Sequence, residues 1–600
     1  MHRLTLVVVL VAIIAAANPL YRIAAHQFSK TSASSTTDLA ELLDPRRLSL
    51  SLCGQDGQRH GLFFRNAFKL SVVPAAMAAE AKPDRPPLWS DLGTYSRKIT
   101  TSEPMAQAYF DQGLRLTFGF NHGEAIRAFR AAQEIDPNCA MCYWAEAFAL
   151  GPNINAPAMD EQSVGPAFSA VAKALALKAK ASEPERALID ALAVRYSPDP
   201  KDEQAPRDKA FAAAMKKVYD AYPGDQDVAT FYAESVMDVM PWDYWERDFR
   251  TPKPEIAKAI AAIESVLKAN PDHPGAIHLY IHLMEASQMP ERAEPYADRL
   301  NGSMPGAGHI VHMPSHIYFR IGRYLDSLEV NVKAVEADEA YFKQAEGSEI
   351  YRYGYYPHNV HFVLVSAQMA GDGETALKFA DKLDKLIPAD MVDIESWIAP
   401  IKTAPYFAYA QFGEPDKVLA LPDPGESPYL QVMWRYARGS AFARQGDAKN
   451  TMAEADKISD LNTPEKIKIY TDKGVPANDI FTIAEMILRA RALQSEGEYD
   501  RAIPLFERAA ELQDGLPYQE PPYWYYSIRQ TVGAAYLQAG KPQKAADAFL
   551  ASLIHHPNSA WSLYGLMKAQ EAASDPAKDV TAGLLEKAAT GKVEVALDRL

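Results

Sequence analysis

Two segments far apart in the chain carry the same spacing of small, aromatic and proline residues. Gly113, Ala125, Phe129 and Pro137 follow one another in steps of 12, 4 and 8, and Gly533, Ala545, Phe549 and Pro557 repeat those steps. A small residue lets one helix approach the next closely, Ala and Phe pack the second helix, and Pro ends it. The spacing therefore predicts paired helices stacked along the chain, with a core shared between neighbouring pairs.

This spacing resembles the tetratricopeptide repeat, a helix–turn–helix unit of 34 residues. Weaker copies fill the region between, where Ala293, Ser327 and Ala376 occupy the second-helix Ala position of three consecutive copies. The resemblance, to the exported bacterial type, implies an all-α fold: an α-solenoid over residues 83–600, with insertions near 152–205 and 240–254. Such solenoids usually bind a protein or peptide in their concave groove, so the resemblance implies a partner of that kind.

Histidines are concentrated in the three consecutive copies. The chain has 14 histidines in 600 residues, and eight of them lie between residues 273 and 361. Counted from the residue equivalent to Gly113, positions −6, −3, +1 and +4 hold His278, His282, Glu285, His309, His312, His316, His358 and His361. At about 100° per residue these positions form one stripe on the first helix, away from the packing positions. We expect this stripe to face the concave groove, while His273 lies in the preceding loop.

The stripe has the chemistry of a transition-metal site. Imidazole is the commonest protein ligand for such ions, and histidines four residues apart on a helix can bind one ion together. Zn, Cu and Fe all accept imidazole, so the metal identity stays open. Glu285 and Glu234 are predicted as ligands or as a general base for metal-bound water. Two alternatives stay open: a hydrogen-bonded histidine ladder, and a titrating groove that binds an anionic ligand with Arg320 and Arg323.

Cys139 and Cys142 stand at the start of a predicted helix. A helix N-terminus lowers the pKa of a thiol, and an oxidising compartment favours a disulfide between the two. Tyr143 occupies the place where a c-type haem motif needs His, so haem attachment is not predicted. The pattern favours a structural disulfide or plain packing over redox or metal chemistry.

The N-terminus is typical of an export signal. Residues 1–24 begin with a short basic stretch, Met1 to Arg3, and continue in a 14-residue apolar run, Leu4 to Ala17. That run is shorter than the roughly 20 residues of a membrane span, although an uncleaved anchor is the alternative and the only membrane contact we expect. Residues 25–82 combine a disorder-prone composition with a second signal-like stretch. The sequence therefore predicts a periplasmic or secreted protein.

Three functions remain open from the sequence. The net charge is −15 and no long Lys/Arg run occurs, so nucleic acid is not an expected partner. The first function is an exported solenoid scaffold that binds a peptide or small ligand in its groove, with the histidine site inside. The second is a metal-dependent hydrolase or oxidase built on the solenoid. The third is a purely structural assembly protein. An open groove would favour the scaffold, and a narrow pocket with carboxylates would favour the enzyme.

Overall fold

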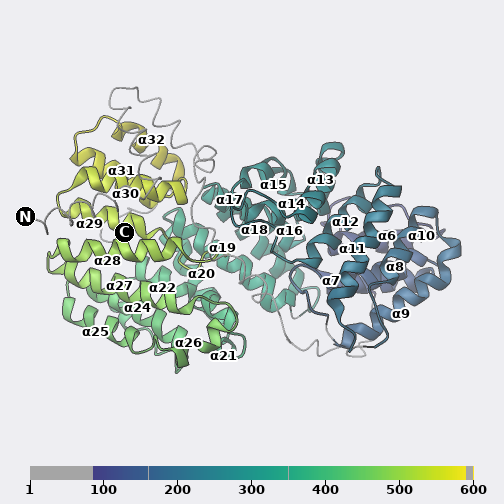
Figure 1. Ribbon diagram of the computed structural model, residues 1–600, viewed down its shortest axis with the longest axis horizontal. Coiled ribbons are helices and arrows are strands. Elements are labelled where there is room, and N and C mark those ends of the chain that lie inside the picture. Colours follow the sequence, from purple (N-terminus) through teal and green to yellow (C-terminus); the bar gives the residue numbers. More distant parts are fainter. Residues whose placement is uncertain (1–84, 160, 200, 349, 590–598, 600) are drawn as a thin grey trace, which may run out of the picture.

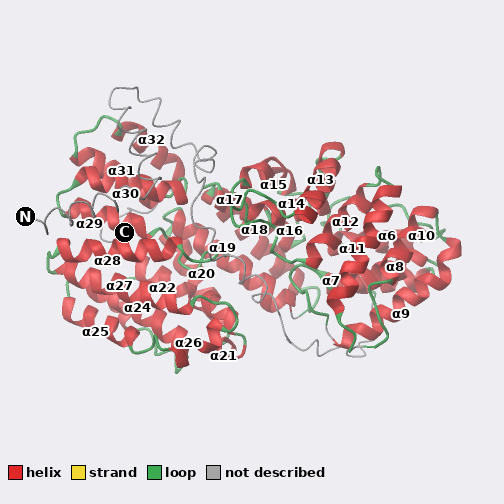
Figure 2. Cartoon of the chain, viewed as in Figure 1, coloured by secondary structure: helices red, strands yellow, loops and turns green. Residues whose placement is uncertain are grey.

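The computed structural model describes residues 85–159, 161–199, 201–348, 350–589 and 599. The described residues fold into helices joined by turns, with isolated β-bridges at Asn153–Ala156 and Trp245–Pro252 (Figure 2). The predicted signal peptide or anchor, 1–24, and the second signal-like segment, 25–82, lie outside these residues. None of the helices in the described part is long and apolar enough to cross a bilayer.

The first half of the described chain runs to the middle of the molecule. Its helices are α6 (Pro104–Phe118), α7 (His122–Ile135), α8 (Ala140–Ala149), α9 (Glu161–Leu177), η1 (Lys178–Lys180), α10 (Glu183–Ala193), α11 (Gln204–Ala221), α12 (Gln226–Val239), α13 (Pro254–Ala269), α14 (Pro274–Glu285), η2 (Pro290–Ala293), α15 (Glu294–Leu300), α16 (Gly308–His312), α17 (Pro314–Arg320) and α18 (Tyr324–Phe342). Segment 152–205, predicted as an insertion, thus contains α9 and α10. Segment 240–254 is a loop closed by the second β-bridge.

The second half continues the stack. Its helices are η3 (Tyr351–Tyr355), α19 (Tyr356–Met369), α20 (Gly373–Leu386), α21 (Met391–Ile394), η4 (Ser396–Ile398), α22 (Ala399–Phe412), α23 (Pro415–Leu419), α24 (Pro428–Arg444), α25 (Ala448–Ser459), α26 (Pro464–Thr471), α27 (Ala477–Ser495), α28 (Tyr499–Asp514), α29 (Ile528–Gln538), α30 (Pro542–His555), α31 (Ala560–Ala572) and α32 (Lys578–Ala588). Consecutive helices pack on one another, as α6 does on α7, α19 on α20 and α29 on α30.

The predicted packing of small residue on aromatic ring is present in both marker repeats. A Cβ atom on Gly113 would lie 2.4 Å from the ring of Phe129, and one on Gly533 would lie 2.9 Å from Phe549. These glycines are therefore required for the close approach of the two helices. The predicted all-α, tetratricopeptide-like solenoid is confirmed.

The turn between the two helices of a repeat has a fixed geometry. Seven residues after the small position stands a glycine with φ between +69° and +77° in five repeats: Gly322, Gly371, Gly446, Gly497 and Gly540. In the first repeat this place belongs to Phe120, with φ of 53°. A non-glycine residue pays about 1–2 kcal/mol for this conformation. Phe120 is thus held in a strained backbone conformation.

The apolar core falls into two main clusters. One runs from Leu92 to Tyr355 and the other from Phe319 to Ala569. Helices α17 and α19 lie between the two halves of the molecule in Figure 1. The histidine-bearing helices α14, α16, α17 and α19 are therefore at the junction of the clusters, which places the histidines in the interior.

Candidate metal centre

Four helices carry the histidine stripe into the interior. His278, His282 and Glu285 lie on α14, His309 and His312 on α16, His316 on α17, and His358 and His361 on α19. The exposed fraction of these side chains' residues is at most 5%, except for His358, which is partly buried. The stripe is therefore buried, and residues of the loops that follow α8, α12 and α28 line the space beside it. A π-helical turn, η3, directly precedes α19, an irregularity that is frequent at functional sites.

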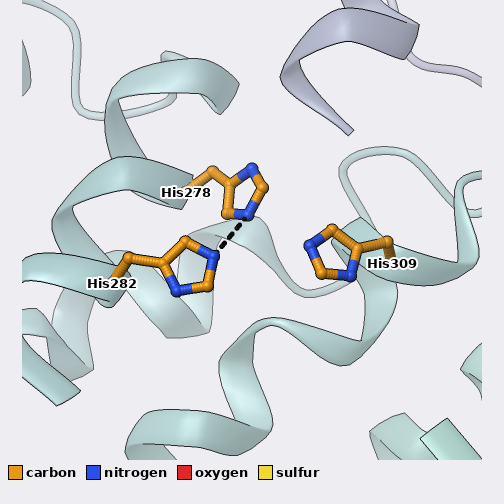
Figure 3. Close-up of side chains that lie close together, drawn as sticks. All are labelled: His278, His282 and His309. Carbon is orange, nitrogen blue, oxygen red and sulfur yellow. Dashed lines mark hydrogen bonds between the residues drawn. The ribbon is translucent and has the colours of Figure 1, made fainter. Parts of the chain in front are cut away.

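The structure gathers six of the histidines into two groups of three. The first group is His278, His282 and His309 (Figure 3), and the second is His312, His316 and His358. In each group one nitrogen per ring lies within 4.8 Å of the others. Each group takes positions −3 and +1 from one repeat and position −6 from the next. The second group is therefore a copy of the first, displaced by one repeat.

The hydrogen bonds of the first group fix where its ring protons lie. Nδ1 of His278 donates to the carbonyl of Phe118 over 2.5 Å, and Nδ1 of His282 donates to Oε1 of Glu285 over 2.7 Å. Burial lowers the pKa of both rings well below the ordinary range, so each is neutral and carries one proton. Both Nε2 atoms therefore present lone pairs. The 3.0 Å contact between them, drawn as a dashed line in Figure 3, then joins two acceptors, because neither Nε2 has a proton to donate.

The second group repeats this arrangement. Nδ1 of His312 donates to Oδ1 of Asn331 over 2.6 Å, and the Asn331 amide is oriented by its own bond to the Ser327 carbonyl. Nδ1 of His316 donates to Oε2 of Glu285 over 2.7 Å and lies 2.8 Å from Oε2 of Glu520. The Nε2 atoms of His312 and His316 are 2.8 Å apart.

Charge differs between the two groups. Burial opposes protonation of His316, but the carboxylates of Glu285 and Glu520 outweigh it and raise its pKa to about 10. The pKa of His312 is instead lowered well below its ordinary value by burial and by His316. In the absence of another cation, the proton on Nε2 of His316 is donated to His312.

Glu285 links the two groups. Its Oε1 accepts from His282 and its Oε2 accepts from His316. It is only 1% exposed, so neither bond competes with bulk water. Glu285, predicted from its place in the stripe, is thus shared by both groups and orients one ring in each.

Glu520 is a site residue that sequence reasoning missed. It belongs to the loop between α28 and α29, and 204 residues separate it from His316. Tyr518 donates a hydrogen bond to Oε1 of Glu520, and burial raises the pKa of the Glu520 carboxyl. Neither a repeat position nor a local motif marks this residue, and only the way the C-terminal repeats fold back brings it to the histidines.

Phe120 covers the first group. Its ring centroid lies 4.4 Å from that of His278, 5.9 Å from His282 and 5.6 Å from His309. Both ring nitrogens of His309 are buried and lack a hydrogen-bond partner, so the structure leaves its lone pair directed into the group. The strained turn at Phe120 accordingly places an apolar ring against the three imidazoles. Phe120 too was missed, although its place where other repeats hold glycine is visible in the sequence.

Several predicted residues lie elsewhere. Nε2 of His361 is bonded to Tyr525, and His361 belongs to neither group of three. Glu234 is not among the described residues that line the histidine cavity, because α12 directs it to a buried cluster with Asp238 and Arg195. Arg320 and Arg323, predicted to bind an anionic ligand, instead contact backbone carbonyls and carboxylates of the protein.

Arg320 donates to the carbonyls of Glu285 and Ser287, and Arg323 pairs with Glu294, Asp298 and Asp326. Cys139 and Cys142 form a disulfide at the start of α8. Arg320 therefore supports the end of α14, which carries half of the first group.

A cavity of about 90 Å³ adjoins both groups. Its lining includes His282 and His309 from the first group, His316 and His358 from the second, and both Glu285 and Glu520. The rest of the wall is largely aromatic and apolar: Trp242, Tyr355, Trp397, Pro400, Tyr518 and Tyr523. At roughly 10–15 Å³ per water, this space holds a small molecule and not a folded peptide segment.

Comparison with solved structures finds likenesses to helical repeat proteins. No family model matches the sequence, and no curated protein matches it. The human IFIT1 dimer with m7Gppp-AAAA is 12% identical, covering 82% of this chain and 90% of its own, with a TM-score of 0.29. Yeast Tom70 is 11% identical, covering 72% and 89%, with a TM-score of 0.26. The P58(IPK) TPR domain is 13% identical, covering 78% and 98%, with a TM-score of 0.22. These values assign no ligand or activity to this chain.

Proposed function

We propose that this protein is an exported metalloenzyme in which the two groups of three histidines each bind one transition-metal ion beside a small-molecule cavity. The observation that carries the proposal is the pair of facing Nε2 atoms of His278 and His282. Two lone pairs at 3.0 Å repel each other, and a cation bound by both turns that repulsion into attraction.

The separations suit imidazole ligation. Two Zn–N bonds of about 2.0–2.1 Å that meet at about 90–110° place their nitrogens about 2.8–3.4 Å apart. The His278–His282 distance of 3.0 Å falls in this range, and the His312–His316 distance of 2.8 Å lies at its lower end. A histidine ladder held by its own hydrogen bonds would instead alternate donor and acceptor nitrogens, which the first group does not.

The surrounding bonds are those of metal ligands. Ligating histidines almost always donate their second ring N–H to a carboxylate or a carbonyl, which fixes the ring for ligation. Phe118, Glu285, Asn331 and Glu520 provide such acceptors to the two groups. The donor set is all imidazole, which suits Zn, Cu or Fe.

The size of the cavity favours an enzyme over a peptide scaffold. It is narrow, it reaches both groups, and it contains two carboxylates. Bound ions would supply Lewis-acid or redox chemistry there, which fits a hydrolase or an oxidase of small molecules. Glu285 and Glu520 then orient histidines at the wall of the cavity. Binding of a protein or peptide partner to the solenoid stays a prediction.

Export is part of the proposal. Its support is the signal-like composition of residues 1–24 and the disulfide between Cys139 and Cys142, a bond that persists in oxidising compartments such as the periplasm. Sequencing the N-terminus of the protein recovered from a periplasmic fraction tests it. An unprocessed, cytosolic protein would contradict it.

Metal analysis tests the centre. We expect two ions per chain in the wild type, one in His278→Gln, one in His312→Gln and two in His361→Gln, the matched control outside both groups. Circular dichroism would establish that each variant is folded. A folded wild type that takes up no Zn, Cu or Fe would overturn the proposal, and so would equal metal content in all four proteins.

A further inference from the structure

The cavity wall contains polar atoms that the rest of the molecule does not satisfy. Outside the two histidine groups, Oδ1 of Asn155, Oε1 of Gln519 and Nδ1 of His361 are buried without a hydrogen-bond partner, and all three residues line the cavity. Asn155 is 4% exposed and His361 is 2% exposed. Buried polar groups in native structures are nearly always paired, so three such atoms in one cavity point to a ligand that pairs with them.

The bonds of His361 show which kind of atom it offers. Tyr525 donates its O–H to the carbonyl of Pro400 over 3.0 Å, so its oxygen must accept from Nε2 of His361 at 2.9 Å. Burial lowers the pKa of His361 to about 3, so the ring is neutral and its single proton is on Nε2. Nδ1 of His361 is therefore an acceptor. The hydrogen bonds from Nε2 to Tyr525 and from Tyr525 to the Pro400 carbonyl keep it so.

The other two atoms have the same character. The amide nitrogen of Asn155 donates to the hydroxyl of Tyr355 over 3.1 Å, which leaves its oxygen as the unpaired atom. Gln519 likewise has its oxygen unpaired. Three acceptors in one small space select a ligand that brings hydrogen-bond donors.

The remaining wall fixes the size and shape of the ligand. Trp242, Trp397 and Tyr355 surround a space of about 90 Å³, smaller than the roughly 150 Å³ cavity that binds benzene. Flat apolar walls favour a flat apolar body, and this volume limits it to one ring after minor side-chain adjustment.

We infer that the cavity binds a one-ring aromatic molecule that bears a hydroxyl or amino group, with a hydroxyl donating to Nδ1 of His361 and an amino group, which has two N–H bonds, donating to Nδ1 of His361 and Oδ1 of Asn155. This site deepens the proposed function, since it would hold such a molecule against both histidine groups. The binding itself does not require the ions, because neither His361 nor Asn155 belongs to a group of three.

Phenol and toluene are the probes, because they have nearly the same shape and differ in the donor. Calorimetric titration of metal-free and Zn-loaded protein should show phenol binding about tenfold more tightly than toluene in both forms, the effect of the one hydrogen bond that the phenol O–H donates. His361→Phe keeps an aromatic ring but removes the acceptor. Tyr525→Phe removes the hydroxyl that holds the His361 proton on Nε2. Each variant should reduce the preference for phenol and leave toluene binding unchanged. Tyr436→Phe removes a buried hydroxyl that pairs with Tyr526, and it serves as the control that keeps the preference.

Each other outcome overturns the inference. Equal affinity for phenol and toluene would mean that water satisfies the three acceptors. Phenol binding only to the Zn-loaded form would mean that it ligates the ion and not His361. No binding of either probe at millimolar concentration would exclude the ligand class. Metal content, measured on the same samples, separates all of these results from a failure of the metal centre.

Discussion

Replacing Glu285 with Gln tests the link between the two histidine groups. The carboxylate accepts from His282 at one oxygen and from His316 at the other, each over 2.7 Å. A Gln side chain has one oxygen and one NH₂ group, so its nitrogen must face an Nδ1–H of one of the two rings. A nitrogen that faces His282 removes the acceptor of that ring, which then meets a second donor and rotates or changes tautomer. A nitrogen that faces His316 leaves that ring a second acceptor, Oε2 of Glu520. The loss of an orienting bond therefore falls on the first group, and the second group keeps its own.

The expected effect is specific to one of the two ions. Loss of a bond that orients a ligating histidine typically lowers metal affinity by about 10- to 100-fold, or about 1.4–2.7 kcal/mol. Competition of the protein with a chromophoric chelator for Zn should resolve one ion weakened by that factor and one bound nearly as in the wild type. Glu185→Gln is the matched control, since Glu185 is equally buried but accepts from Thr100 and Ser182. Unchanged affinity for both ions in folded Glu285→Gln would refute the reasoning.

Three further predictions concern stability. Burial and the neighbouring Asp238 raise the pKa of Glu234 to about 8 from 4.5, so the stability associated with its neutral form is complete below about pH 4.5 and is lost as the pH rises through about 8. Glu234→Gln should thus lose less free energy of unfolding than the wild type between pH 5 and pH 8 in urea titrations, and equal losses would count against this. Joint replacement of Cys139 and Cys142 by Ser should cost about 2 kcal/mol of stability, for so short a loop, without changing metal content. Zn at 100 times its dissociation constant should add about 2.7 kcal/mol per site to the free energy of unfolding, and a chelator should remove it.

The repeat register explains why much of the site was predictable. His278 and His312 share position −3 of their repeats, and His282 and His316 share position +1. In each repeat, Nε2 of the first histidine therefore contacts Nε2 of the second. In the third copy Val365 stands where those histidines would be. His361 therefore has no partner four residues on, and it bonds to Tyr525 instead. The stripe predicted which helix faces carry the histidines, and six of its seven histidines form the two groups of three.

The remainder depended on contacts that no spacing encodes. A repeat motif predicts which face of a helix points away from the other helix of the same repeat. It does not predict which distant segments cover that face, because this depends on the curvature of the solenoid. Here the loop that carries Glu520 reaches His316, and the histidine stripe is buried. Glu234 was predicted for the same site, but it lies with Asp238 and Arg195 in a separate buried cluster.

Anomalous diffraction from crystals grown with Zn, Cu or Fe would test the central claim most directly. We predict two peaks at the absorption edge of the bound metal, one within bonding distance of Nε2 of His278 and His282 and one within bonding distance of Nε2 of His312 and His316. Crystals soaked to saturation that show no peak at either group, or peaks only at surface residues, would contradict the account.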